Sequence, residues 1–426
     1  MFLQNPHFWL VFIVAASILL MLVRAWRIPE AYWIAGGVAL LLVFRLEPLL
    51  GAAHAAAKGT DVYLFLIGMM LLSELSAKHG VFDWLSSAAV RHAGGSTSFL
   101  FLLVYGAGTL VTIFMSNDAT AVVLTPAILA AVRKARIEPL PYLFVCAFIA
   151  NAASFVLPIS NPANLVVFHK EMPALGEWLL RFGLPSLLSI LTTFWVLRWM
   201  FRRHLREPIT VQISENHFLH DHGKLMLASL GATAVVLLIA SALHWDLGLP
   251  TCLTALAVTV IVSLLSRSNP LPLFREISWS TLALVAGLFI MVDAVERIGA
   301  MRITQAWLAR VVAMPATAGA LLAGFVVGVA NNLVNNLPLG LIAGSTLQAT
   351  HGKGLIASSV LIGVDLGPNL SITGSLATIL WLIALRKEKL EVSFWSFLKI
   401  GAIAMPAALF CSLLGAIFMQ LCFGYR

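Results

Sequence analysis

Charged side chains are scarce in this 426-residue sequence: they make up 11% of it, whereas hydrophobic residues make up 60%. Soluble globular domains carry about 25% charged residues, so this composition excludes a soluble fold. The hydrophobic residues gather in successive apolar segments, and a helix needs about 20 such residues to cross a bilayer. We therefore predict an all-α polytopic membrane protein that is surrounded by the lipid bilayer.

Cysteine is rare as well, and this limits the chemistry open to the chain. Its four copies, Cys146, Cys252, Cys411 and Cys422, form no CxxC pair and no cluster with histidine. The pattern excludes a disulfide framework and a structural zinc site, and we predict neither a metal nor a cofactor. No GxSxG, HExxH or P-loop motif occurs, which argues against an intramembrane enzyme and against ATP hydrolysis by this chain.

The 27 basic residues outnumber the 19 acidic ones, but they lie in short loops between apolar segments. This is the positive-inside pattern of membrane proteins, and we predict no nucleic-acid partner. The basic loops share the cytoplasmic side only if segments 98–132 and 317–350 are re-entrant hairpins. We therefore predict about ten transmembrane helices plus two re-entrant hairpins, with both termini outside and Arg297, Arg302 and Arg310 as exceptions. The apolar elements are 8–23, 28–46, 62–77, 98–132, 141–169, 183–201, 224–243, 250–266, 279–295, 317–350, 354–385 and 397–422.

The sequence contains an internal repeat. Residues 68–80 (GMMLLSELSAKHG) align with residues 287–299 (GLFIMVDAVERIG), 219 positions later, and the same spacing carries Asn117 onto Asn336. With the basic loops on the cytoplasmic side, segment 62–77 runs inward and its counterpart 279–295 runs outward. The two repeats therefore have opposite orientations. Inverted repeats with helices broken at the bilayer midplane are the architecture of secondary transporters. The predicted units are a first repeat 1–202 (hairpin 98–132, broken helix 141–169), a cytoplasmic linker 203–223, and a second repeat 224–426 (hairpin 317–350, broken helix 354–385).

Four polar interruptions, two in each half, lie in the middle of apolar elements, at 116–120, 157–164, 331–338 and 365–375. Unpaired backbone at that depth is tolerated only inside protein or against a cavity. Amide and hydroxyl side chains there can cap helix ends and can also bind a ligand; pure capping by the asparagines at the hairpin tips is the alternative. We predict that the breaks converge on a substrate site formed by Ser116, Asn117, Asp118, Ser160, Asn161, Asn164, Asn335, Asn336, Thr373 and Ser375.

Two carboxylates lie within these breaks. A carboxylate near the bilayer centre costs about 2.5–3.5 kcal/mol on insertion scales, and no basic residue occurs between Arg91 and Arg133 to pair with Asp118. We therefore predict that Asp118 is the main proton-coupling residue. Asp365 is the second candidate, with capping of a half-helix as the alternative.

Two further acids are matched by the repeat and receive a different interpretation. Glu74 and Asp293 each precede a base, Lys78 and Arg297, by four residues. This is the favourable spacing for a salt bridge along a helix. We interpret both as ion pairs at the ends of spans.

The interrupted segments are also similar to those of a known group. The strings FMSNDATAVVLTPAI, NAASFVLPISNPANLVVF and NNLVNNLP resemble the ion-transporter superfamily, and most closely the ArsB-type arsenite/antimonite efflux permeases. The resemblance implies export of trivalent arsenic or antimony hydroxide in exchange for protons across the cell inner membrane, either alone or with a soluble arsenite-stimulated ATPase. In the dicarboxylate branch the hairpin tips typically read Ser-Asn-Thr. Here they read SND and NNL, which favours the permease branch.

The charge of the substrate points the same way. Arsenous acid is neutral at neutral pH, and amides and hydroxyls bind it without a counter-charge, whereas Asp118 would repel a dicarboxylate. A sodium- or proton-coupled carboxylate or other anion symporter of the same superfamily is the alternative function.

Overall fold

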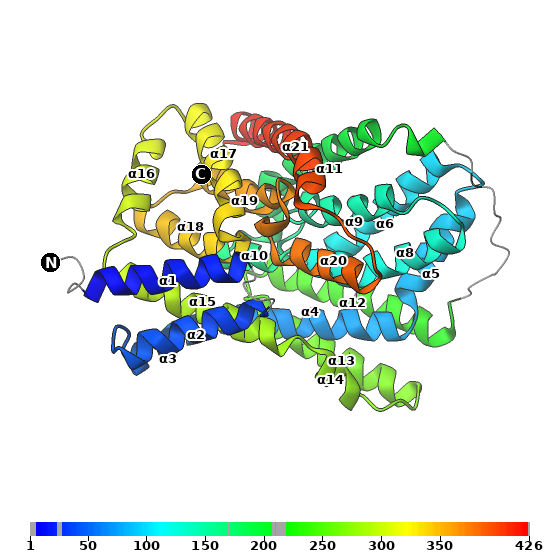
Figure 1. Ribbon diagram of the computed structural model, residues 1–426, viewed down its shortest axis with the longest axis horizontal. Helices are drawn as coiled ribbons and strands as arrows, with labels where there is room; N and C mark the ends of the chain where they lie inside the picture. Colours follow the sequence, from blue (N-terminus) through cyan, green and yellow to red (C-terminus); the bar gives the residue numbers. More distant parts are fainter. Residues whose placement is uncertain (1–5, 24–27, 169–170, 207–208, 210–218, 425–426) are drawn as a thin grey trace.

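The computed structural model describes residues 6–23, 28–168, 171–206, 209 and 219–424, and within them every regular element is a helix (Figure 1). The helices of the first half are α1 (Pro6–Val23), α2 (Glu30–Val43), α3 (Leu49–Lys58), α4 (Thr60–Lys78), α5 (Val81–His92), α6 (Thr97–Phe114), α7 (Asn117–Ala119), α8 (Thr125–Lys134), α9 (Leu140–Ala152), α10 (Pro162–Phe168) and α11 (Leu175–Met200). Those of the second half are α12 (Asp221–Ala242), α13 (Gly248–Leu265), α14 (Leu271–Glu276), α15 (Trp279–Arg297), α16 (Arg302–Val312), α17 (Ala316–Val334), α18 (Asn336–Thr350), α19 (Gly354–Leu366), α20 (Leu376–Lys387) and α21 (Phe394–Phe423).

The described helices account for the predicted number of membrane crossings. Eight of them are long and apolar enough to span a bilayer, and two of the eight, α6 and α17, are the first arms of the hairpins. The other six, the shorter apolar helices α1 and α2, and the broken elements α9/α10 and α19/α20 make ten crossings. The polytopic all-α class is therefore confirmed. The boundaries of the two repeats stay a prediction, and residues 207–208 and 210–218 of the expected linker lie outside the described residues.

The outer surface of the helical body is apolar, as a lipid environment requires. Trp195 and Trp199 on α11, Phe418 and Leu421 on α21 and Leu264 on α13 are all more than half exposed. Soluble monomers rarely present such continuous apolar surface to water. These side chains face the bilayer.

The order of elements in the first half recurs in the second. α4 packs on α13, and the repeat-related helix α15 packs on α2. The two contacts are close: a side-chain carbon on Gly68 would lie 2.7 Å from the backbone oxygen of Thr251, and one on Gly287 would lie 2.5 Å from the side chain of Ile34. These four helices form a tightly packed frame.

The two hairpins enter the body from opposite ends. Figure 1 shows α16, α17 and α18 toward the end where α1 begins, and α5, α6 and α8 toward the other end. The end with α5, α6 and α8 also carries Lys78, Arg133 and Arg386, each at or near the end of a helix. We call this end the basic face. The end with α16 and α18 is called the opposite face. This arrangement is what inverted repeats produce.

Polar contacts between closely spaced backbones hold the second hairpin to its broken helix. Asn331 Nδ2 on α17 donates to the carbonyl oxygens of Gly363 (2.9 Å) and Val364 (2.7 Å) on α19. A side-chain carbon on Gly367 would lie 2.3 Å from the oxygen of Gly328, so this crossing requires glycine. Small residues at helix crossings are the usual means of close association in a membrane.

Candidate substrate site at the helix breaks

Each hairpin tip begins its returning helix with a side-chain cap. Ser116 Oγ accepts from the backbone nitrogen of Ala119 at 3.2 Å, and Asn335 Oδ1, 219 positions later, accepts from that of Leu337 at 3.5 Å. Asn335 also has a φ of +80°, a conformation that costs a residue with a side chain about 1–3 kcal/mol and that gathers at functional sites. The capping that was the alternative for Asn117 and Asn336 is thus performed by the residue before each of them.

Asn117 and Asn336 are left with unused hydrogen-bonding capacity. Their side chains are 2% and 3% exposed, and the Oδ1 atom of each has no hydrogen-bond partner among the described residues. A buried amide oxygen without a partner costs about 1–3 kcal/mol. Each hairpin tip therefore holds a buried acceptor that no described residue satisfies.

The returning arm of the first hairpin contains a π-helical turn, from Thr120 to Leu124. Thr125 Oγ1 donates to the oxygen of Thr120 at 3.0 Å, and the next residue, Pro126, has no backbone N–H to continue an α-helical pattern. Thr120 also shares a 2.8 Å hydrogen bond with Thr112 on the outgoing arm. π turns occur mostly as single bulges and frequently lie at functional sites.

In each half a hydroxyl of the broken helix is bound to the adjacent hairpin. Ser160 Oγ donates to the oxygen of Ile113, and Thr373 Oγ1 donates to that of Asn332, both at 3.0 Å. Ile113 and Asn332 are 219 positions apart, so the two bonds are equivalent. Asn335 Nδ2 adds a bond of 3.2 Å to the Thr373 oxygen. The structure therefore gives Ser160 and Thr373, two of the predicted site residues, a role in joining hairpin and break.

The second half-helices, α10 and α20, begin at matched residues. Asn161 Oδ1 accepts from Ala163 N at 3.0 Å, and Ser375 Oγ accepts from Thr378 N at 3.1 Å. Asn164 Nδ2, a predicted ligand, donates instead to the carbonyl oxygens of Ser154, Leu157 and Pro158 at 2.9, 3.3 and 3.3 Å, and so shapes the loop before α10.

Two asparagines that were not predicted join the halves. Asn151 Nδ2 donates to Asn369 Oδ1 at 3.0 Å, and Asn369 Nδ2 donates to the oxygen of Phe148 at 3.0 Å. Both side chains are fully buried. They are 218 positions apart, so the internal repeat relates them. This spacing is the sequence signal that identifies the pair.

Asp365 forms a second link between the halves. Its Oδ1 accepts from Asn161 Nδ2 at 2.7 Å, its Oδ2 has no partner among the described residues, and the side chain is fully buried. The carboxyl thus lies beside the start of α10, where the helix dipole is favourable for negative charge. Two predicted residues from opposite halves, Asn161 and Asp365, are in direct contact.

Asp118 faces a cavity of about 230 Å³ between the first hairpin and the frame. Pro162 and Leu376, the first residues of α10 and α20, line its deep end beside Ser116 and Asp118. Its other end reaches Glu74, one turn before α4 ends at the basic face. The remaining lining residues are Leu66, Met69, Met70, Ser73, Ala119, Val122, Val123, Glu276, Ser278, Thr281 and Leu380, so the lining includes three acids and no base.

The interpretation of Glu74 as an ion pair with Lys78 is wrong. Lys78 Nζ donates to the backbone oxygen of Asn269 at 3.4 Å, and Glu74 turns into the cavity, where Glu276 is its charged neighbour. The interpretation of Asp293 is confirmed, because Arg297 contacts its Oδ2 at 2.9 Å. The spacing of four residues permits a salt bridge but does not decide between competing partners.

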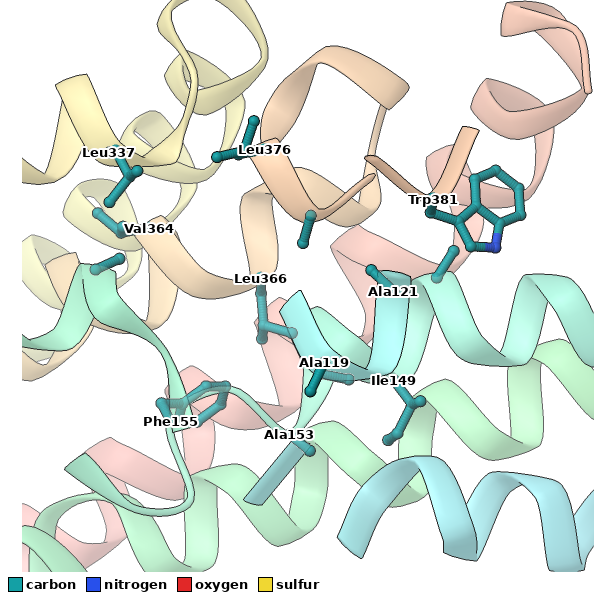
Figure 2. Close-up of a cluster of buried hydrophobic side chains, with 14 of the residues drawn as sticks. Ala119, Ala121, Ile149, Ala153, Phe155, Leu337, Val364, Leu366, Leu376 and Trp381 are labelled. Atoms are coloured by element: carbon teal, nitrogen blue, oxygen red, sulfur yellow. The ribbon is translucent and has the colours of Figure 1, made fainter. Parts of the chain in front are cut away.

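Apolar side chains fill the space around these polar groups. Figure 2 shows Ala119 from the first hairpin near Leu366 of α19, and Leu337 of the second hairpin near Val364 of α19. Leu366 and Ala119 are 0% and 3% exposed. Trp381 on α20 is also buried and donates from Nε1 to the oxygen of Leu143 at 3.0 Å. The polar groups of the breaks therefore lie among buried apolar side chains.

Inverted helical halves, two hairpins that enter from opposite ends and polar breaks that meet beside a cavity define a membrane transporter. The chain belongs to the CitMHS family, described as citrate transporters, whose model matches residues 6–386. It therefore also belongs to the wider ion-transporter superfamily that the interrupted strings resemble.

Individual proteins from several bacteria are similar over most of their length. The arsenical pump membrane protein of Yersinia enterocolitica is 25% identical over 82% of this chain and 83% of its own, and that of Escherichia coli K12 is 23% identical over the same shares. An uncharacterized transporter of Mycobacterium tuberculosis is 25% identical over 84% of this chain and 86% of its own. The YdaH transporter of Alcanivorax borkumensis, whose crystal structure is described as having an unusual topology, shares the fold with a TM-score of 0.59, 14% identity and 99% coverage of both chains.

Proposed function

We propose that this protein exports trivalent arsenic or antimony hydroxide, arsenite or antimonite, in exchange for protons and so confers metalloid resistance. The observation that carries the proposal is the lining of the Asp118 cavity, which contains three carboxyl groups and no basic side chain. Such a surface repels anions and admits a neutral solute. The similarity to arsenical pump membrane proteins supports the same substrate class.

The binding chemistry follows from the groups that retain free capacity. A trihydroxide offers three O–H donors, and the unpartnered Oδ1 atoms of Asn117 and Asn336 are acceptors at the two hairpin tips. Asp118 adds a carboxyl group beside Asn117 that faces the cavity. The other predicted ligands hold this arrangement: Ser116 and Asn335 cap the returning helices, Ser160 and Thr373 fasten the breaks, and Asn161, Asn164 and Ser375 shape the half-helices.

Proton coupling is assigned to Asp118 and Asp365. Asp118 lies on the cavity, so it exchanges protons with the basic face, whereas Asp365 is sealed inside the protein and is bonded to Asn161. An elevator-type or rocking movement would carry the hairpins and broken helices past the frame of α2, α4, α13 and α15. Asp118 would take up a proton on the far side as the substrate leaves, and would release it when the site returns.

The rival function is sodium- or proton-coupled symport of a carboxylate. The description of the family as citrate transporters favours it. Citrate carries up to three negative charges and would need basic side chains or a bound cation at the site. The cavity lining supplies three carboxyl groups instead, and for this reason we place metalloid export first.

The test uses everted membrane vesicles with an imposed pH gradient. Wild-type protein should accumulate arsenite and lose this activity when the gradient is dissipated, and Asp118→Asn should lose gradient-driven accumulation. Asp221→Asn is the matched control, because Asp221 forms an exposed pair with Lys224 at 2.9 Å and should not affect transport. Uptake of labelled citrate without any uptake of arsenite, or wild-type rates in Asp118→Asn, would refute the proposal.

Location and partner belong to the same proposal. The bacterial relatives are consistent with the cell inner membrane as the site of action. A soluble arsenite-stimulated ATPase would dock on the basic face, near segment 202–223, most of which lies outside the described residues.

A further inference from the structure

The mouth of the Asp118 cavity holds two acids from different helices. Glu74 lies near the end of α4, Glu276 is the last residue of α14, and both line the cavity. Neither forms a salt bridge with a described residue, and each is the other's charged neighbour. The two side chains are in hydrogen-bond contact, and because two ionised carboxylates repel one another, one of them must hold a proton as long as no cation lies beside the pair.

The equivalent place in the other half is built differently. Asp293, the repeat counterpart of Glu74, is contacted by Lys58 Nζ at 2.6 Å and by Arg297 at 2.9 Å. Arg297 also bridges to Glu47, in the turn before α3. At the opposite face, then, the carboxylate is neutralised by two protein cations.

The spacing of the repeat explains the difference. A shift of 219 positions carries Lys58, the last residue of α3, onto residue 277, directly after Glu276 at the end of α14. The same shift relates Lys78 to Arg297, and Lys78 likewise reaches the turn before the short helix, at Asn269. At the basic face, this shift places the uncharged Ile277 where the other half has Lys58, so Glu74 has no ammonium group in that place.

The surroundings of the two acids supply further oxygen atoms. Ser73, beside Glu74, is 6% exposed, lines the cavity, and has an Oγ atom without a partner among the described residues. Ser278 and Thr281 at the start of α15 line the same cavity and share a 2.8 Å hydrogen bond. Carboxylate and hydroxyl oxygens are ligands for hard cations.

We propose that Glu74, Glu276 and Ser73 bind a monovalent inorganic cation at the mouth of the cavity, in the place that the Lys58 ammonium occupies in the other half. One ammonium is missing, so a single positive charge is the replacement. The site goes beyond the proposed export function, because it requires no particular substrate and its occupancy is measurable without one. It would hold together α4 and α14 at the basic face, as Lys58 and Asp293 hold α3 and α15 at the opposite face.

The experiment measures thermal unfolding of the purified full-length protein in detergent, without substrate, at constant ionic strength as NaCl or KCl replaces choline chloride. Wild type should show a saturable rise in Tm of about 2 °C or more. Glu276→Gln should lose the rise. Glu296→Gln, an acid lining the cavity of the opposite face, should retain it.

Glu276→Lys provides a second arm that does not depend on loss of stability. It introduces a covalently attached ammonium group next to the position that corresponds to Lys58, so its Tm in choline chloride should match or exceed that of wild type in NaCl, and should not respond to Na⁺ or K⁺. The proposal is overturned if wild type responds to neither ion, if only Mg²⁺ stabilises it, or if Glu276→Gln keeps the full response. Because no transport is measured, these outcomes are independent of whether arsenite is the substrate.

Discussion

The contact between Asn151 and Asn369 allows a quantitative test of how the two halves are joined. Asn369→Ala would leave the Phe148 oxygen without its 3.0 Å donor and would remove the acceptor of Asn151. Two buried groups that each lose a partner cost about 2–6 kcal/mol together. Asn151 Nδ2 keeps longer contacts of 3.4 Å to Ala147 O and Thr378 Oγ1, so we expect a loss near the lower end of this range.

A double-mutant cycle isolates the contribution of the bond itself. Interhelical hydrogen bonds in membranes give coupling energies that average about 0.6 kcal/mol and reach about 1.7 kcal/mol. We expect Asn151→Ala combined with Asn369→Ala to be less destabilising than the sum of the single changes by about that amount, measured by SDS-induced unfolding. Asp221→Ala combined with Asn369→Ala should be additive. Additivity of the asparagine pair within about 0.3 kcal/mol would show that the bond does not join the halves.

Two further predictions concern packing and pH. Gly367→Ala would place a carbon 2.3 Å from the oxygen of Gly328 and should abolish a monodisperse peak in size-exclusion chromatography, whereas Gly106→Ala, which meets open space, should elute like wild type. Burial, with smaller contributions from the charges of Lys78 and His222, lowers the pKa of His79 below its ordinary value, so the folded protein should lose stability as the pH falls below about 6.5. His79→Gln should reduce this loss in thermal unfolding between pH 7.5 and 5.5, and an unchanged pH profile would contradict the assignment.

The fold was predictable because its signals are local. The lengths of the apolar segments predicted the number of membrane crossings, and the polar interruptions predicted the hairpin tips and the broken helices. The spacing of 219 positions predicted how the two halves correspond. At α10 and α20 the equivalent capping residues, Asn161 and Ser375, are 214 positions apart, five fewer than the spacing of 219 that relates the halves elsewhere. The loop between Asn151 and α10 is longer than its counterpart, and sequence similarity alone does not place such a gap.

The site was predictable by region and less so by role. The sequence indicates that polar side chains in a helix break must form hydrogen bonds, but it does not indicate which groups are their partners. Ser160 and Thr373 proved to be bonded to hairpin carbonyls, and Asp365 to Asn161 across the halves. These contacts join residues 41 to 204 positions apart, and no local pattern reveals them. The cavity was missed for the same reason, since its walls come from α4, the first hairpin and the start of α15.

The π turn at Thr120–Leu124 determines the direction in which the hairpin tip points. A π turn contains one residue more than an α turn, and each residue of an α-helix advances by about 100° around the axis. Asp118, on the far side of this turn from α8, is therefore rotated by about a quarter of a revolution from where an uninterrupted helix would aim it. Deleting one residue between 120 and 124 would leave every side chain of the tip in the sequence yet turn the carboxyl group away from its cavity. The orientation of this group is thus a property of the backbone, set by the number of residues in the turn.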